Sequence, residues 1–435
     1  MSIRAMQARF PGALLLLCAL LAGCQGGAPS DGLAVVRDSA GVAIHEFPAG
    51  VLQHPPALRL ADAPDVRIGA VEGAAEYQWT HPVAAARLSD GGFAVLEQLP
   101  AEIRVFDASG VFVRRIGREG DGPGEFRSPL ELTALDGDTL LVWDRGSRRL
   151  SWFSIDGVLQ REQLLTEPGG IRTIRHVALT PVGTPVVIGA TTTEEELGNQ
   201  GRVREVWQVV PVGPRRETGE PLGAVPGTER SIQVQGSATG EVVSVNVQGR
   251  WWWGEGFAWP SERGVWTGDQ LAFEARHFHL EGGLDRIVRV MGEERDFTQA
   301  LIDSLHGVEL DRVTDPELRE LWRADFEGRD YPSAVPPVAS VFADSGGRVW
   351  IGLTEPPPEG LPSGRFTAIR RWLLFQVGGA GAATEPGSSS PLRPLGVLTL
   401  PPRSHPLWAD REGVLLVRND PELDVAYIEW YGFME

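Results

Sequence analysis

The sequence predicts an all-β fold built from repeated four-stranded units, and two observations carry this prediction. Residues 66–88 and 114–135 align with each other, and the matched pairs Ile68–Gly69 and Ile116–Gly117 lie 48 residues apart. Each repeat also consists of short apolar segments separated by Asp/Gly turns. Four short strands in a period of about 40–50 residues are typical of a β-propeller blade.

Further units of the same kind can be followed to the end of the sequence. After the two aligned repeats, we expect a third blade over about 172–225, a fourth over 253–291 and a fifth over 336–400. Residues 405–433 supply only three strands of a sixth blade. The segment 65–70 reads as an outer strand without neighbours, so we expect it to pair with 424–431 and close a six-bladed ring of four-stranded blades.

The glycine-rich stretch RIGREGDGPGEF (115–126) at first resembles a phosphate-binding loop. Such a loop needs a helix behind it, because the helix N-terminus supplies the N–H groups that bind the phosphate. The residues that follow Phe126 read as a strand with a proline at its start. We therefore interpret the glycines as the turn between the outer strand of one blade and the inner strand of the next.

One segment, about 295–330, has helical rather than strand periodicity and is expected as an insertion between blades four and five. Thr314 to Glu317 fit a capping box, with Leu318, Leu321 and Trp322 on one helix face. We expect the insertion to pack outside the ring or over one of its mouths, and a packing element is the interpretation that the sequence favours.

The chain begins with a targeting segment. Residues 1–23 combine two arginines with a short apolar run, and LAGC ends at Cys24. This sequence resembles a bacterial lipobox. We therefore expect residues 1–23 to be a lipoprotein signal peptide and Cys24 to carry the lipid. An ordinary signal peptide is the alternative. Gln25 is not the aspartate that retains lipoproteins in the inner membrane of enteric bacteria, which favours the outer membrane. Residues 24–64 then form a tether and an N-terminal hairpin, and 65–435 form the propeller.

Composition narrows the chemistry. The formal net charge is −18, which argues against nucleic acid or an anionic membrane surface as a partner. All 40 basic residues are arginine, so chemistry that depends on a lysine is excluded. The two cysteines are Cys18 and Cys24, which leaves the mature chain without a disulfide or a cysteine nucleophile once Cys24 carries lipid.

Residues 33–431 resemble the six-bladed β-propeller lipoproteins of Gemmatimonadota-like and Bacteroidota-like bacteria, which are similar to NHL-repeat propellers. The segments that carry the resemblance are VVRDSAGVAIHEF, ARLSDGGFAVLEQ, EIRVFDASGVFVRRIGREGDGPGEF and SGGRVWIG. The resemblance implies the fold and an extracytoplasmic location. NHL-like propellers include binding scaffolds, hydrolases and lyases, so the resemblance does not choose among these functions.

Histidines are the candidate ligands for a metal ion. His81, His176 and His405 each stand at the start of an inner strand in a different blade, so similar strand registers would place them at one end of the central channel, around a transition metal or an anion. His277 and His279 lie two residues apart on one face of a strand and could begin a second site. For His81, His176 and His405 the alternative is a histidine that only satisfies a loop carbonyl. For His277 and His279 the alternative is a chance occurrence, because no third ligand lies nearby in the sequence.

Two classes of function remain open at this point. The segment RWWWGEGFAW (250–259) is expected to pack between blades, with sugar stacking as the alternative. Inner strands are mostly apolar, with Glu131 as the exception, whereas a metal-dependent lactonase-like hydrolase or lyase needs several polar inner positions. We therefore expect a monomeric, lipid-anchored binding or scaffold module for a protein, peptide or glycan. No cofactor and no catalytic residue are assigned, and the metal-dependent enzyme is the alternative.

Overall fold

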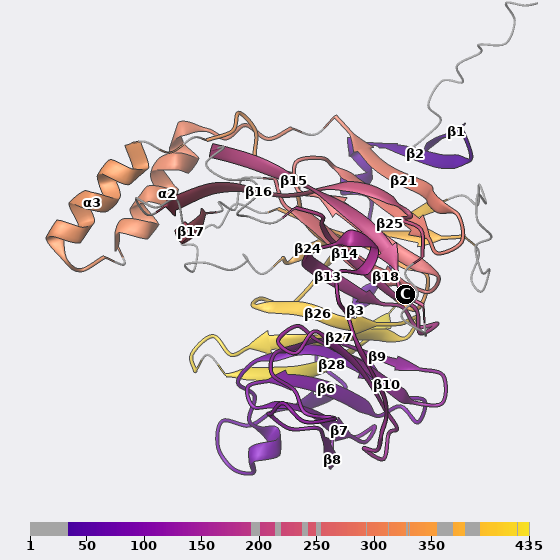
Figure 1. The fold of residues 1–435 in the computed structure, drawn as a ribbon. Coiled ribbons are helices and arrows are strands. Elements are labelled where there is room, and N and C mark those ends of the chain that lie inside the picture. Colours follow the sequence, from indigo (N-terminus) through magenta and orange to yellow (C-terminus); the bar gives the residue numbers. More distant parts are fainter. Residues whose placement is uncertain are drawn as a thin grey trace, which may run out of the picture.

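The computed structural model describes residues 34–434 except 193–200, 214–218, 237–241, 249–253, 355–368, 379–391 and the single positions 293, 312, 328, 330 and 424. Within this part of the chain the strands form six sheets, which we number 1 to 6 in chain order of their innermost strands (Figure 1). Four consecutive antiparallel strands form the body of five of the sheets. The predicted all-β fold is therefore confirmed.

Sheets 1 to 3 use consecutive strands. Sheet 1 contains β5 (Pro82–Arg87), β6 (Phe93–Gln98), β7 (Ala101–Phe106) and β8 (Phe112–Ile116). Sheet 2 contains β9 (Pro129–Leu135), β10 (Thr139–Asp144), β11 (Arg149–Phe153) and β12 (Leu159–Leu164). Sheet 3 contains β13 (Thr173–Leu179), β14 (Pro185–Ala190), β15 (Gly201–Pro211), β16 (Gly223–Gly236) and β17 (Val242–Gln248).

Sheets 4 and 6 each also recruit strands from the N-terminal part of the chain. Sheet 4 contains β18 (Gly256–Ser261), β19 (Gly264–Asp269), β20 (Glu274–His279) and β21 (Gly283–Met291), followed by β2 (Val42–Pro48) and β1 (Val35–Ser39). Sheet 5 contains β22 (Val338–Ala343), β23 (Arg348–Leu353), β24 (Arg371–Val377) and β25 (Leu392–Thr399). Sheet 6 contains β26 (Ser404–Ala409), β27 (Gly413–Asn419) and β28 (Ala426–Met434), with β3 (Arg59–Leu60) and β4 (Val66–Ile68) on β28.

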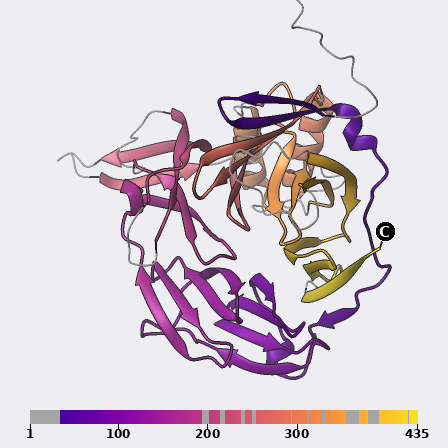
Figure 2. The ribbon, with the colours of Figure 1, turned by 90° about the vertical axis from the view of Figure 1, so that its right-hand side faces the viewer.

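Apolar side chains hold each sheet against the next. Separate buried clusters join sheets 1 and 2, 2 and 3, 3 and 4, 4 and 5, and 5 and 6, and another joins sheet 6 to sheet 1. Figure 2 shows the same order, with the sheets following one another around a common centre. Both faces of most sheets are therefore covered, which explains why central strands such as β6, β10 and β14 carry continuous apolar runs instead of alternating apolar and polar residues. This arrangement is typical of a β-propeller.

The N-terminal strand β4 completes sheet 6. Val66, Arg67 and Ile68 pair antiparallel with Trp430, Glu429 and Ile428 of β28, so the predicted pairing between 65–70 and 424–431 is confirmed. Ile68 is 1% exposed and belongs to the cluster between sheets 6 and 1. Trp79 donates its indole N–H to the Ile68 carbonyl at 3.0 Å. This short strand therefore contributes to a core as well as to a ladder.

The glycine-rich stretch connects β8 to β9, as the absence of a following helix predicted. Gly117 has a φ of 72°, and Phe126 packs against it, so a side chain at position 117 would collide with that ring. Glu125 accepts hydrogen bonds from the Gly122 N–H at 2.8 Å and from Arg118. The Glu125 carboxylate therefore stabilises the turn of this loop. The loop also places the buried Phe126 in the cluster between sheets 1 and 2.

The N-terminal hairpin and sheet 3 extend beyond the regular units. β2 pairs in parallel with β21, which adds the β1–β2 hairpin to the outer edge of sheet 4, and a short 3-10 helix η1 (Ala49–Gln53) follows. Sheet 3 continues to residue 248, whereas the sequence placed its end near 225. The reason is that β16 is 14 residues long and pairs with β17, in a segment of alternating apolar and polar residues that was not assigned from the sequence.

Two helices, α2 (Gln299–Asp311) and α3 (Pro316–Glu327), lie between β21 and β22 and form an arm at one edge of the molecule (Figure 1). The expected cap is wrong by one residue: Asp315, not Thr314, accepts hydrogen bonds from the N–H groups of Glu317 and Leu318. Pro316 therefore takes the first helical position, where proline is favoured. Leu318 and Leu321 are 46% and 67% exposed, so the expected apolar face is not buried.

Candidate functional site

A cavity of about 120 Å³ lies where the innermost strands of all six sheets meet. Each sheet contributes residues from its first strand or from the turn that follows it. The lining residues are Val83, Ala84, Ala85, Glu131, Leu132, Thr133, Leu179, Pro181, Trp259, Pro260, Ser261, Glu262, Phe342, Ala343, Asp344, Ser345, Leu407, Trp408 and Ala409. The wall is thus mostly apolar and aromatic with a few polar groups, which is the usual composition of a ligand site.

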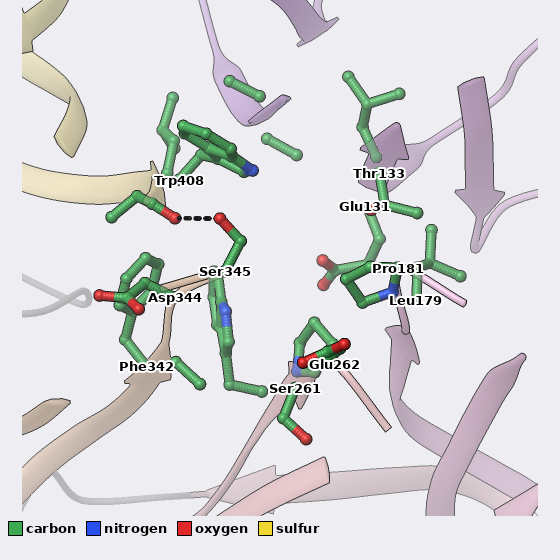
Figure 3. Close-up of a pocket in the computed structure, with 18 of the residues that line it drawn as sticks. Glu131, Thr133, Leu179, Pro181, Ser261, Glu262, Phe342, Asp344, Ser345 and Trp408 are labelled. Atoms are coloured by element: carbon green, nitrogen blue, oxygen red, sulfur yellow. Dashed lines mark hydrogen bonds between the residues drawn. The ribbon is translucent and has the colours of Figure 1, made fainter. Parts of the chain in front are cut away.

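Glu131 is the polar group that stands apart in this cavity. Figure 3 shows its carboxyl group reaching inward from sheet 2, on the side opposite Ser345 and Trp408. Within the described residues, it makes no hydrogen bond and no ion pair. Burial raises the pKa of Glu131 to about 8, because removal of water disfavours the charged form. The carboxyl group is therefore protonated at neutral pH and would ionise readily if a cation approached it.

Two other polar groups of the wall, those of Asp344 and Ser345, are engaged by the protein itself. Asp344 accepts hydrogen bonds from the backbone N–H of Arg348 at 2.9 Å, from its Nε at 2.5 Å and from Trp350 Nε1 at 2.8 Å. Burial raises the pKa of Asp344, and the charge of Arg348 opposes that rise. Ser345 donates its hydroxyl to the Ala409 carbonyl at 3.2 Å, which joins sheet 5 to sheet 6 (Figure 3). These groups hold the wall together and leave Glu131 available.

A second arrangement at the edge of the cavity was not predicted. Ser261 Oγ lies 2.8 Å from His277 Nε2, and His277 Nδ1 lies 2.7 Å from Asp285 Oδ1. These are the residue types and the order of the hydrogen-bonded triads of hydrolases. In Figure 3 the Ser261 side chain leaves the cavity floor and turns away from Glu131. His277 also packs against Trp266, at 4.9 Å between ring centroids, so the chain of hydrogen bonds connects β18, β20 and β21 inside sheet 4.

Among the described residues, His81, His176 and His405 do not form a group of three that could hold a metal ion. Burial lowers the pKa of His405 to about 4, and the charge of the nearby His81 contributes a smaller part of this shift. His176 belongs to sheet 3 and packs against Trp207, at 5.2 Å between ring centroids. Burial likewise lowers the pKa of His176 to about 4. In the described part of the chain, no three His, Cys, Asp or Glu side chains gather to hold a metal ion.

The other sequence candidates have structural partners or lie outside the described residues. The rings of His277 and His279 are 6.5 Å apart, and His279 Nδ1 accepts the Glu281 N–H, so the pair does not converge on one ion. Trp259 packs between sheets 4 and 5, at 4.7 Å from the Phe342 ring, and also lines the cavity. Residues 251–253, the signal peptide 1–23 and Cys24 lie outside the described residues. No helix of the described part of the chain is long and apolar enough to cross a membrane.

One comparison with known proteins bears on the fold. A family model described as a 6-bladed β-propeller matches residues 82–166. Among solved structures, a Bacteroides fragilis protein described as exported shares 8% identity with a TM-score of 0.45, over 87% of this chain and 96% of that one. A DUF4221-family protein of Bacteroides vulgatus shares 10% identity with a TM-score of 0.44, over 87% and 99%. Virginiamycin B lyase of Staphylococcus aureus shares 8% identity with a TM-score of 0.38, over 86% and 99%. No curated protein matches.

The family description and the observed sheets agree on a β-propeller. Sequence reasoning noticed Glu131 only as a polar exception on an inner strand, which was the available signal for the cavity. It missed the link between Ser261, His277 and Asp285, because no local motif connects residues on three different strands.

Proposed function

We propose that the chain is a lipid-anchored, extracytoplasmic six-bladed β-propeller that binds its ligand in the central cavity. The single observation that carries this proposal is the unpaired carboxyl group of Glu131, which faces a cavity that is otherwise apolar and aromatic. This carboxyl group faces the cavity without a protein partner, so a ligand that pairs with it would gain binding free energy. The pairing of β4 with β28 and the six inter-sheet clusters support a closed ring around this site.

A binding role fits this wall better than the metal-dependent alternative. A hydrolase or lyase with a channel metal needs several ligands that converge from the inner strands. Among the described inner strands, Glu131 supplies the only carboxyl group that lines the cavity, and the candidate histidines do not form a group of three metal ligands. The cavity has room for a small molecule or for one side chain of a larger partner, so a protein, a peptide or a glycan terminus remains a suitable ligand.

Filling the cavity should abolish binding. A thermal-shift screen with small molecules, peptides and glycans should identify compounds that raise the melting temperature of the wild type, and Thr133→Trp, in the cavity wall, should remove that shift. Val158→Trp is the matched control, because Val158 is 63% exposed outside the cavity. Both variants should keep the wild-type circular dichroism spectrum. Ligands that stabilise the Thr133→Trp variant as much as the wild type would place the binding site elsewhere.

The proposed lipid anchor depends on Cys24. Replacing Cys24 by alanine should move the protein from the membrane fraction into the soluble extracytoplasmic fraction, because no other segment is expected to hold it at the membrane. Immunoblots of both fractions, together with labelling by an alkyne-tagged fatty acid, measure this change. We prefer the outer membrane, and density-gradient separation of the two membranes tests that preference. An unlabelled wild type, or a variant that remains membrane-bound, would contradict the lipobox.

A further inference from the structure

The charge of the cavity wall is one-sided. Three carboxyl groups line it, those of Glu131, Glu262 and Asp344, and no basic residue does among the described lining residues. The partner of Asp344 is Arg348, with which it forms a buried ion pair at 2.5 Å, so its charge is compensated from within the wall. Glu131 and Glu262 remain as groups that can face a ligand. The cavity therefore attracts a cation and repels an anion, and the net charge of −18 acts in the same direction.

The aromatic residues of the wall specify what kind of cation fits. Trp259, Phe342 and Trp408 line the cavity, and the rings of Trp259 and Phe342 lie 4.7 Å apart. Aromatic faces attract organic cations through the ring quadrupole, and they also cover the methylene groups of such a ligand. A bare metal ion would gain little here, because it needs several oxygen or nitrogen ligands and the described residues provide no such group.

We infer that the cavity binds an alkylammonium group, with its charge against the Glu131 carboxylate and its carbon atoms against the aromatic wall. This inference rests on the proposed function and makes it more specific. The cavity of about 120 Å³ accommodates a group of this size and not a whole peptide or glycan. The group is either a free amine or the end of a side chain on a larger partner, and both share the same chemistry.

Binding should be coupled to a proton. Burial raises the pKa of Glu131 to about 8, so below pH 8 the carboxyl group must lose its proton before it can pair with a cation. Glu262 and the Asp344–Arg348 pair are the other charged groups of the wall. Strands β5, β6, β10 and β13 pack against β9, and their charged and titratable groups have other partners. Glu97 and Asp144 accept hydrogen bonds from loop N–H groups, and His176 packs on Trp207. Arg87 pairs with Glu412, and Arg175 pairs with Glu205.

Isothermal titration of the full-length mature protein with simple amines tests the inference. We expect n-butylammonium to bind at least tenfold more tightly than 1-butanol. Tetramethylammonium, which does not titrate, should bind about tenfold more tightly at pH 9 than at pH 7, with release of nearly one proton at pH 7. At pH 9, Glu131→Gln should weaken binding of both cations at least tenfold. Glu320→Gln, on the exposed surface of α3 away from the cavity lining, is the control and should change binding less than threefold.

The outcomes separate this inference from the proposed function. Equal binding of butanol and butylammonium, lost in Thr133→Trp, would overturn the cation preference and leave the cavity as the binding site. If no cation binds, the inference is overturned. The thermal-shift comparison of the wild type with Thr133→Trp then still tests whether the cavity is a binding site. A lysine-containing peptide that binds more tightly than butylammonium, and loses binding on acetylation, would support a protein partner. Tighter binding of butylammonium than of the lysine-containing peptide would support a free amine as the ligand.

Discussion

Replacing Ile68 by aspartate should lower the free energy of unfolding by roughly 4 kcal/mol or more, although Ile68 belongs to a strand of only three residues. Ile68 is 1% exposed and packs in the cluster between sheets 6 and 1, opposite Ile428 in the ladder. A carboxylate there loses its water and finds no positive partner within that cluster. Because β4 joins two segments about 360 residues apart, its release would also leave the edge of β28 open.

Denaturant unfolding, followed by tryptophan fluorescence, measures this effect. Val36→Asp is the matched control, since Val36 lies on β1, is 46% exposed and should change stability by less than about 0.5 kcal/mol. Deletion of residues 34–70 should be more damaging than Ile68→Asp, because it also removes the hairpin on sheet 4. An Ile68→Asp variant as stable as Val36→Asp would mean that the ring does not depend on β4.

The repeat was readable from the sequence because it has a local cause. Turns between neighbouring blades require glycine where φ is positive, as at Gly117, and buried strands require continuous apolar runs. Glu97 and Asp144 extend the same repeat: both are buried, lie 47 residues apart and accept the N–H groups of the loop that enters an inner strand. Local requirements of this kind recur in sheets 1 and 2, so they leave a period in the sequence there.

Features that depend on the assembled ring left no such signal. The cavity collects Glu131, Trp259, Phe342 and Trp408 from four sheets, and none of these positions is unusual in its own strand apart from the charge of Glu131. The proximity of His81 and His405 likewise follows from how the sheets pack. Periodicity predicts which residues share a face of one strand, but it does not predict which faces meet at the centre.

The buried ion pair in the cavity wall leads to the second large effect. Asp344→Ala should destabilise the protein by about 3–5 kcal/mol, because it leaves the Arg348 guanidinium buried without its counter-ion and Trp350 Nε1 without an acceptor. The two side chains are 0% and 5% exposed. Arg348 keeps a hydrogen bond to the Asp410 carbonyl and its place 4.6 Å from the Phe433 ring centroid, which stabilise its position but do not neutralise its charge.

A double variant distinguishes loss of the charge pair from loss of packing. Asp344→Ala combined with Arg348→Met removes both charges while keeping the side-chain volume that packs on Phe433, so it should recover a substantial part of the stability lost in Asp344→Ala alone. Glu320→Ala on α3 is the exposed control: Glu320 pairs with Arg323, is 69% exposed and should cost less than about 0.5 kcal/mol. If the double variant were less stable than Asp344→Ala, the Arg348 guanidinium would have a stabilising partner other than Asp344.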